Sequence, residues 1–118
     1  MTSIERKHVS SRMSRIVRHG DVVYLCGQTS SGTAITDVAG QTREVLARVD
    51  GLLAEAGTDK SRLLAATIHL RDIDDFAEMN AIWETWTADG CAPARTTVQA
   101  RLASPDLRVE ITVIAAAR

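Results

Sequence analysis

The feature that most constrains the fold is an imbalance between the helical and the strand-like segments. Only two stretches, 37–57 and 75–90, have apolar side chains at the three- and four-residue steps of an amphipathic helix. Six other runs have the composition of strands: 4–9, 15–18, 22–26, 63–70, 94–102 and 107–114. The order β-β-β-α-β-α-β-β predicts an α+β domain with a mixed sheet, in which two helices pack on only one face.

The other face of this sheet also needs a cover, because Val, Ile and Leu occur on both sides of several predicted strands. The simplest cover is a second copy of the chain, packed sheet against sheet around a symmetry axis. The residues therefore predict a homo-oligomer, and 118 residues predict a single domain over 1–118.

Local signals predict how the helices begin and end. Asp37 has the residue type and position of an N-cap, and Gly57 those of a residue that ends a helix. Gly51 interrupts the first helix, which suggests close packing on the sheet at that point. Asp75 and Glu78 have the spacing of a capping box at the start of the second helix.

Alternation predicts the faces of two strands. In 63–70, Leu64 is expected on the apolar face with Leu70, and His69 on the opposite face. The segment 109–114 has Val, Ile and Val on one side and Ile114 on the other, which predicts a central strand.

Composition excludes several functions. The net charge is −1 and aromatic residues make up 3%, which disfavours nucleic acid and membrane surfaces as partners. The N-terminal MTSIERKHVS lacks the apolar region of a secretory signal, and no apolar run approaches the length that spans a bilayer. Two cysteines and three histidines have no metal-ligand spacing. We expect a cytoplasmic protein without metal or cofactor.

Two ionisable residues stand out because they interrupt segments that are otherwise typical of strands. Arg95 lies near the start of 94–102, and Glu110 lies inside the apolar run 109–114. Two interpretations follow from the residues alone. Arg95 and Glu110 form a structural ion pair, or they belong to a functional site.

A family resemblance favours the second interpretation. The chain resembles the Rid family of enamine and imine deaminases, also called the YjgF family, over nearly its whole length. The resemblance rests on Cys26-Gly27-Gln28, on the helix-to-strand stretch 53–70, on Asn80, and above all on Pro93-Ala94-Arg95 followed by Val109-Glu110-Ile111.

The resemblance implies a chorismate-mutase-like fold, a homotrimer, and three clefts between subunits. It implies that Arg95 binds the carboxylate of a 2-imino acid and that Glu110 positions the attacking water. The backbone carbonyls of Gly27 and Thr97 are expected to orient the imine nitrogen and the water, with Asn80 and Met13 beside the substrate. The expected reaction is cofactor-independent hydrolysis to a 2-keto acid and ammonia.

Two positions depart from the pattern of many family deaminases, which have Cys in place of Thr97 and Tyr in place of Met13. An alternative function is therefore a trimeric protein that binds small carboxylates in the same cleft without chemistry. Ribonuclease activity, reported for some relatives, is a third hypothesis. The weak net charge and the lack of an evident catalytic histidine pair argue against it.

Overall fold

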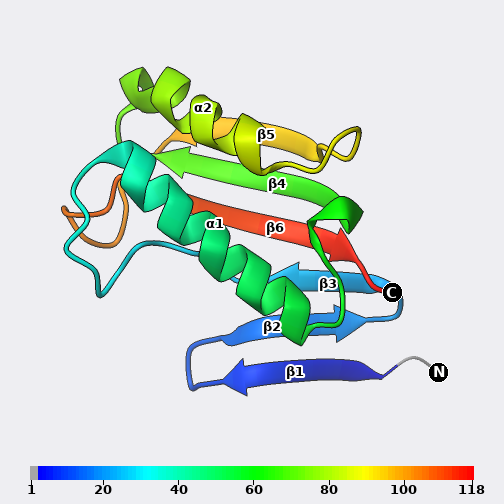
Figure 1. The fold of residues 1–118 in the computed structure, drawn as a ribbon. Helices are drawn as coiled ribbons and strands as arrows, with labels where there is room; N and C mark the ends of the chain where they lie inside the picture. Colours follow the sequence, from blue (N-terminus) through cyan, green and yellow to red (C-terminus); the bar gives the residue numbers. More distant parts are fainter. Residues whose placement is uncertain (1–2) are drawn as a thin grey trace.

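The computed structural model describes residues 3–118 and contains a six-stranded mixed sheet with both α-helices on the same face (Figure 1). The strands are β1 (Ile4–Val9), β2 (Ser14–His19), β3 (Val22–Leu25), β4 (Leu63–Leu70), β5 (Ala94–Gln99) and β6 (Val109–Ala116), and the helices are α1 (Val38–Glu55) and α2 (Phe76–Trp86). The strand order is β1-β2-β3-β6-β4-β5, and only the β4–β5 pair is parallel. The predicted α+β class and the one-sided helix layer are confirmed.

Strand β6 lies between β3 and β4, so the prediction of a central final strand is confirmed. Val109, Ile111 and Val113 are fully buried under the helices, whereas Glu110 and Thr112 point to the opposite side and are only half-buried. We call that opposite side the open face, because no element of residues 3–118 covers it (Figure 1).

The open face carries apolar side chains as well as polar ones. Tyr24 on β3 and Val98 on β5 are 45% and 41% exposed, and Ile114 on β6 is half-buried between β3 and β4. Water-exposed apolar groups on a sheet face are typical of a surface that packs against a partner. The homo-oligomer stays a prediction.

Helix α1 follows its sequence signals closely. The Asp37 carboxylate accepts a hydrogen bond from the Gly40 N–H at 2.9 Å, and Gly57 after the helix has φ +76°, the left-handed conformation that favours glycine. The buried stripe is Val38, Gln41, Thr42, Val45, Leu46, Val49, Leu52 and Leu53. The prediction for Gly51 is wrong: a Cβ there would meet nothing within 4 Å, so Gly51 faces outward rather than the sheet.

The predicted capping box of α2 does not form. Asp75 makes no side-chain cap hydrogen bond, because a 3-10 turn over Ile73–Asp75 precedes the helix and holds Asp75 near φ −78°, ψ 2°. The Asp72 carboxylate caps that turn instead, through the N–H of Asp74. The Asp75 carboxylate faces Arg108 at 3.5 Å.

Three strand details also differ from the sequence prediction. A register irregularity between Leu63 and Ala65 turns Leu64 outward, where it is 48% exposed. The fifth strand ends at Gln99, and the sixth starts at Val109 because a turn and a side chain take the N–H groups of residues 107 and 108.

Candidate functional site

Arg95 is held in one orientation by α2. It is paired with Ala66 in the β4–β5 register, which directs it to the helix side of the sheet. Its Nη1 donates to Asn80 Oδ1 at 2.8 Å, and its Cζ lies 5.6 Å and 5.5 Å from the ring centroids of Phe76 and Trp83. No ion pair of the described residues includes Arg95. The guanidinium is therefore oriented and still able to bind an anion.

Thr97 lies two residues further along β5, on the same side as Arg95, because it pairs with Ile68. Its hydroxyl oxygen is buried and has no hydrogen-bond partner within residues 3–118. Strand β5 is an edge of the sheet, so it has backbone groups that the chain itself leaves unpaired. The side chains of Arg95, Asn80 and Thr97 thus gather along the α2 side of this edge.

Gly27 and Glu110 form a second close contact, at the end of β3. Two backbone hydrogen bonds between Gln28 and Ile111, of 2.9 and 3.1 Å, bring this segment onto β6. A Cβ at Gly27 would lie 3.0 Å from Glu110 Cδ, nearer still to Oε2, and 3.1 Å from Thr112 Oγ1. The Glu110 carboxylate therefore lies directly over the Gly27 backbone, in a position that it could not keep if residue 27 had a Cβ.

Met13 lines a cleft of about 570 Å³ that also includes Gly27, Arg48 and Glu55. The Met13 side chain is half-exposed. A hydrogen bond from His8 lowers the pKa of the Glu55 carboxyl, partial desolvation opposes this, and nearby positive charges add to it. The cleft adjoins the glycine end of the Gly27–Glu110 contact, and neither Arg95 nor Glu110 lines it.

Arg95 and Glu110 lie on opposite faces of the sheet. The register aligns Arg95 with Ala66, and Glu110 with His69 and, across β4, with Val98. The two residues are thus three positions apart along the strands and two strands apart across the sheet, about 10 Å in each direction. The hypothesis of a structural ion pair is wrong for a single chain.

The same geometry divides the predicted residues into separate groups. Arg95, Asn80 and Thr97 lie by α2, and Gly27 contacts Glu110 just after β3. Met13 lies apart from Glu110, in the cleft that Gly27 shares with α1 residues such as Arg48. A ligand the size of a small imino acid cannot touch both Arg95 and Glu110 of one chain.

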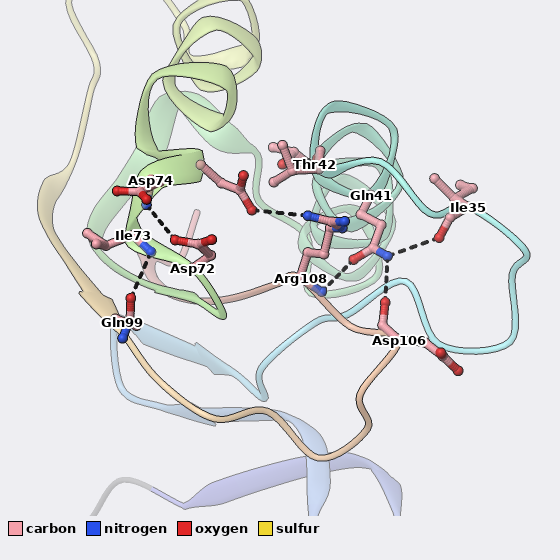
Figure 2. Close-up of polar contacts among 11 residues, drawn as sticks. Ile35, Gln41, Thr42, Asp72, Ile73, Asp74, Gln99, Asp106 and Arg108 are labelled. Atoms are coloured by element: carbon pink, nitrogen blue, oxygen red, sulfur yellow. Dashed lines mark hydrogen bonds and ion pairs between the residues drawn. The ribbon is translucent and has the colours of Figure 1, made fainter.

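Gln41 is a residue that the sequence analysis missed. It is 1% exposed, and its Nε2 donates to the carbonyls of Ile35 and Asp106 at 2.9 and 2.8 Å (Figure 2). Its Oε1 accepts from the Arg108 N–H at 2.7 Å, directly before β6 begins. Gln41 thereby sets the start of the strand that carries Glu110. A polar residue inside the apolar stripe of a helix was the available signal.

Other polar groups are scattered. Within residues 3–118 no three His, Cys, Asp or Glu side chains gather as metal ligands would, and no helix of that range is long and apolar enough to cross a bilayer. Cys26 and Cys91 are both free thiols. A hollow of about 690 Å³ lies where β4 and β5 end, by Arg71, Gln99 and Arg101, and contains none of the predicted site residues.

Comparison with known proteins identifies the family. The family model described as Endoribonuclease L-PSP matches residues 4–117. The RutC family protein YoaB of Escherichia coli K12 is 41% identical over 114 residues, 97% of this chain and 98% of that protein. A solved YjgF-family protein of Neisseria meningitidis superposes with a TM-score of 0.94 at 42% identity, covering 98% of this chain and 96% of that one. The chain belongs to the YjgF (Rid) family.

Family membership confirms the resemblance inferred from the P-A-R and V-E-I motifs. The YjgF family includes a protein of Escherichia coli K12 named 2-iminobutanoate/2-iminopropanoate deaminase. It is 30% identical to this chain over 105 residues, which is 84% of this chain and 82% of that protein. Imine deaminases are thus among the relatives of this YjgF-family chain.

Proposed function

We propose that the chain hydrolyses 2-imino and enamino acids to 2-keto acids and ammonia, without a cofactor, in clefts between the subunits of a homotrimer. The observation that supports the proposal most strongly is that Arg95 is held in one orientation without a carboxylate partner in the described part of the chain. Its guanidinium is fixed by Asn80 and two aromatic rings, and it lacks a carboxylate partner within residues 3–118. A planar cation held in this way suits a substrate carboxylate, which it can bind through two parallel hydrogen bonds.

Glu110 supplies the second requirement of the reaction, an acceptor that orients water. Hydrolysis starts when water adds to the C=N carbon of a protonated imine, and a carboxylate that accepts a hydrogen bond from that water directs its attack. Gly27 leaves room for the carboxylate. The backbone carbonyls of Gly27 and Thr97 orient the imine nitrogen and the water, and Met13 supplies an apolar wall.

The assembly follows from the two faces of the sheet. Arg95 and Glu110 of one chain cannot reach one small substrate, because strand register places them on opposite faces. A neighbouring copy that covers the open face can bring its own Arg95 beside Glu110. The trimer, with three such clefts, is the assembly that the family resemblance implies.

A binding function is the second candidate. Met13 in place of a tyrosine removes a hydroxyl from the cleft, and the same Arg95 would hold a 2-keto acid without turnover. The ribonuclease hypothesis, which the family model's description carries, is weaker here. The three histidines lie on three different strands, and the His8 side chain is engaged by Glu55 at 2.5 Å.

The test is turnover of 2-iminobutyrate generated in place by an amino-acid oxidase, with semicarbazide as a trap for free imine. Arg95→Ala should leave the assembly intact and lower kcat/KM roughly ten- to a hundred-fold, as expected for loss of a charge-assisted hydrogen-bond pair. Arg95→Lys should recover little, because an ammonium lacks the planar fork. Arg101→Ala, an exposed arginine after β5, is the matched control.

Three results separate the candidates. Wild-type turnover in folded Arg95→Ala would refute the role of Arg95. No turnover in the unmodified protein, together with 2-oxobutyrate binding that needs Arg95, would establish the binding function instead. Cleavage of RNA by a metal-free sample would favour the ribonuclease hypothesis.

A further inference from the structure

His69 carries a polar atom that the chain itself leaves unexplained. Its Nδ1 is buried and without a hydrogen-bond partner, one of two such side-chain atoms in residues 3–118. Buried ring nitrogens of histidine are normally paired, so an unpaired one calls for a ligand, a water or a neighbouring chain. His69 as a whole residue is half-buried, on β4.

The neighbours of His69 place it beside the proposed chemistry. It is the direct cross-strand partner of Glu110 in the antiparallel β4–β6 pair, which sets their Cβ atoms about 5 Å apart on the open face. On its other side β5 contributes Val98, which does not titrate. Thr67 precedes it on this face of β4, and Arg71, two residues after it, is the nearest basic residue along the chain. Glu110 is the titratable group that faces His69 from an adjacent strand.

We propose that His69 is a proton-transfer residue of the imine hydrolysis and acts together with Glu110. The inference rests on the proposed function and adds a residue to it. Glu110 is turned toward Gly27, which suits it to orient water, whereas the buried Nδ1 of His69 makes no hydrogen bond within residues 3–118 that would compete for the proton. A neutral imidazole can accept a proton on one nitrogen and donate one from the other.

The step balances without an oxidant or a reductant. Water oxygen bonds to C2 of the protonated imine while the C=N π bond breaks, and one water proton passes to the His69 imidazole. The imidazolium then returns this proton to the amine nitrogen of the tetrahedral intermediate. The C–N bond breaks, ammonia leaves, and the remaining hydroxyl proton passes to Glu110 or solvent as the keto C=O forms.

The experiment compares His69→Phe, His69→Gln and the control His19→Gln, an exposed histidine on β2. The rate of 2-iminobutyrate hydrolysis is measured from pH 5 to 9 with excess oxidase. We expect the wild type and His19→Gln to lose kcat toward acid pH, as a base becomes protonated. Both His69 variants should have kcat lower by about 10²-fold and no acidic limb, with 2-oxobutyrate binding and thermal stability retained.

A second measurement does not depend on turnover. The imidazole NMR signals of His69 are assigned as those present in the wild type and absent from His69→Gln. They should shift when 2-oxobutyrate is added to the wild type. In Arg95→Ala the same addition should cause no shift. Turnover in both His69 variants with an unchanged pH profile would overturn the role of His69 and leave the proposed function standing. Absence of turnover in the wild type would overturn both, and keto-acid binding without an imidazole shift would place His69 outside the cleft.

Discussion

Replacing Gly27 with alanine tests whether the Glu110 carboxylate occupies the position that the structure gives it. The new Cβ would lie 3.0 Å from Glu110 Cδ and closer still to Oε2, nearer than a Cβ atom normally approaches another atom, so the carboxylate must move. The Gly27 backbone is not in the left-handed region, so the conformation itself accepts alanine. The perturbation therefore acts mainly on the Glu110 carboxylate, with a milder contact at Thr112 Oγ1, 3.1 Å from the new Cβ.

The expected magnitude follows from that contact. An ordinary contact needs the carboxylate to retreat by about 1 Å, and a side chain forced off its rotamer costs about 0.5–1.5 kcal/mol. Alanine also lowers the conformational entropy of the unfolded chain relative to glycine, which stabilises the folded state by about 0.4–1 kcal/mol. Gly27→Ala should thus destabilise the fold by less than about 1 kcal/mol, while a 1 Å displacement of a reacting group lowers turnover by about 10²-fold.

A double-mutant cycle with Glu110→Ala isolates the contact. Urea unfolding of the wild type, both single variants and the double variant should give a coupling of about 0.5–1.5 kcal/mol, because only the milder contact with Thr112 opposes alanine at 27 once the carboxylate is gone. Gly51→Ala is the control: it has free space around the new Cβ, sits in a helix interior, and should stabilise the fold by about 0.5–1 kcal/mol. An equal effect of Gly27→Ala in both backgrounds would refute the contact.

Two further predictions concern stability. Gln41→Ala should lower the free energy of unfolding in urea by about 2–4 kcal/mol, since it leaves two carbonyls and one N–H at part-buried positions without their partner. The control Gln99→Ala removes one exposed hydrogen bond to Ile73 and should cost under about 1 kcal/mol. Equal costs for the two variants would contradict the network in Figure 2. Hydrogen bonds from Ser61 and then Arg118 lower the pKa of Asp59 from 3.8 to about 2, so its stabilising contribution is present above pH 4 and lost as the pH falls toward 2. Asp59→Asn should flatten the pH dependence of unfolding in that window, and an unchanged curve would count against the interaction.

The sequence predicted those parts of the fold that depend on local patterns. Asp37 and Gly57 predicted the ends of α1, because a cap signal acts within one turn. Apolar residues on both sides of 109–114, together with the family resemblance, predicted a central strand. The predictions for Gly51 and for the Asp75 capping box were wrong because they are not decided within one segment. Each depends on what lies beyond its own segment, open solvent in one case and a preceding 3-10 turn in the other.

The candidate site was predictable as a set of residues and not as an arrangement. The motifs drew attention to Arg95 and Glu110, and only strand pairing separates them onto two faces. His69 and Gln41 carry no motif, and their partners are about 40 and 70 positions away along the chain, across β6 and the 105–108 loop. Pairings of that sequence separation are invisible to a single sequence read by local periodicity.

If Arg95 and Glu110 of one cleft come from different chains, inactive variants should rescue each other. Arg95→Ala chains keep Glu110, and Glu110→Gln chains keep Arg95, so a cleft between one of each can be wholly unmodified. Random assembly from equal amounts in a cyclic oligomer gives such a cleft about a quarter of the time. The unselected mixture of co-expressed, differently tagged variants should therefore regain about a quarter of wild-type turnover, and trimers purified through both tags about a third, whereas either variant alone keeps only its own reduced rate.

The fraction of unmodified clefts also tests the alternative in which one chain supplies both Arg95 and Glu110. If one chain supplied both residues, every cleft would contain a defect, and mixing would restore nothing. Strand register argues against that outcome, because it holds the two side chains on opposite faces and about 10 Å apart both along and across the sheet. A mixed oligomer, purified through both tags and still inactive, would mean that one of the two side chains crosses the sheet edge to meet the other. The division of the site between copies would then be wrong.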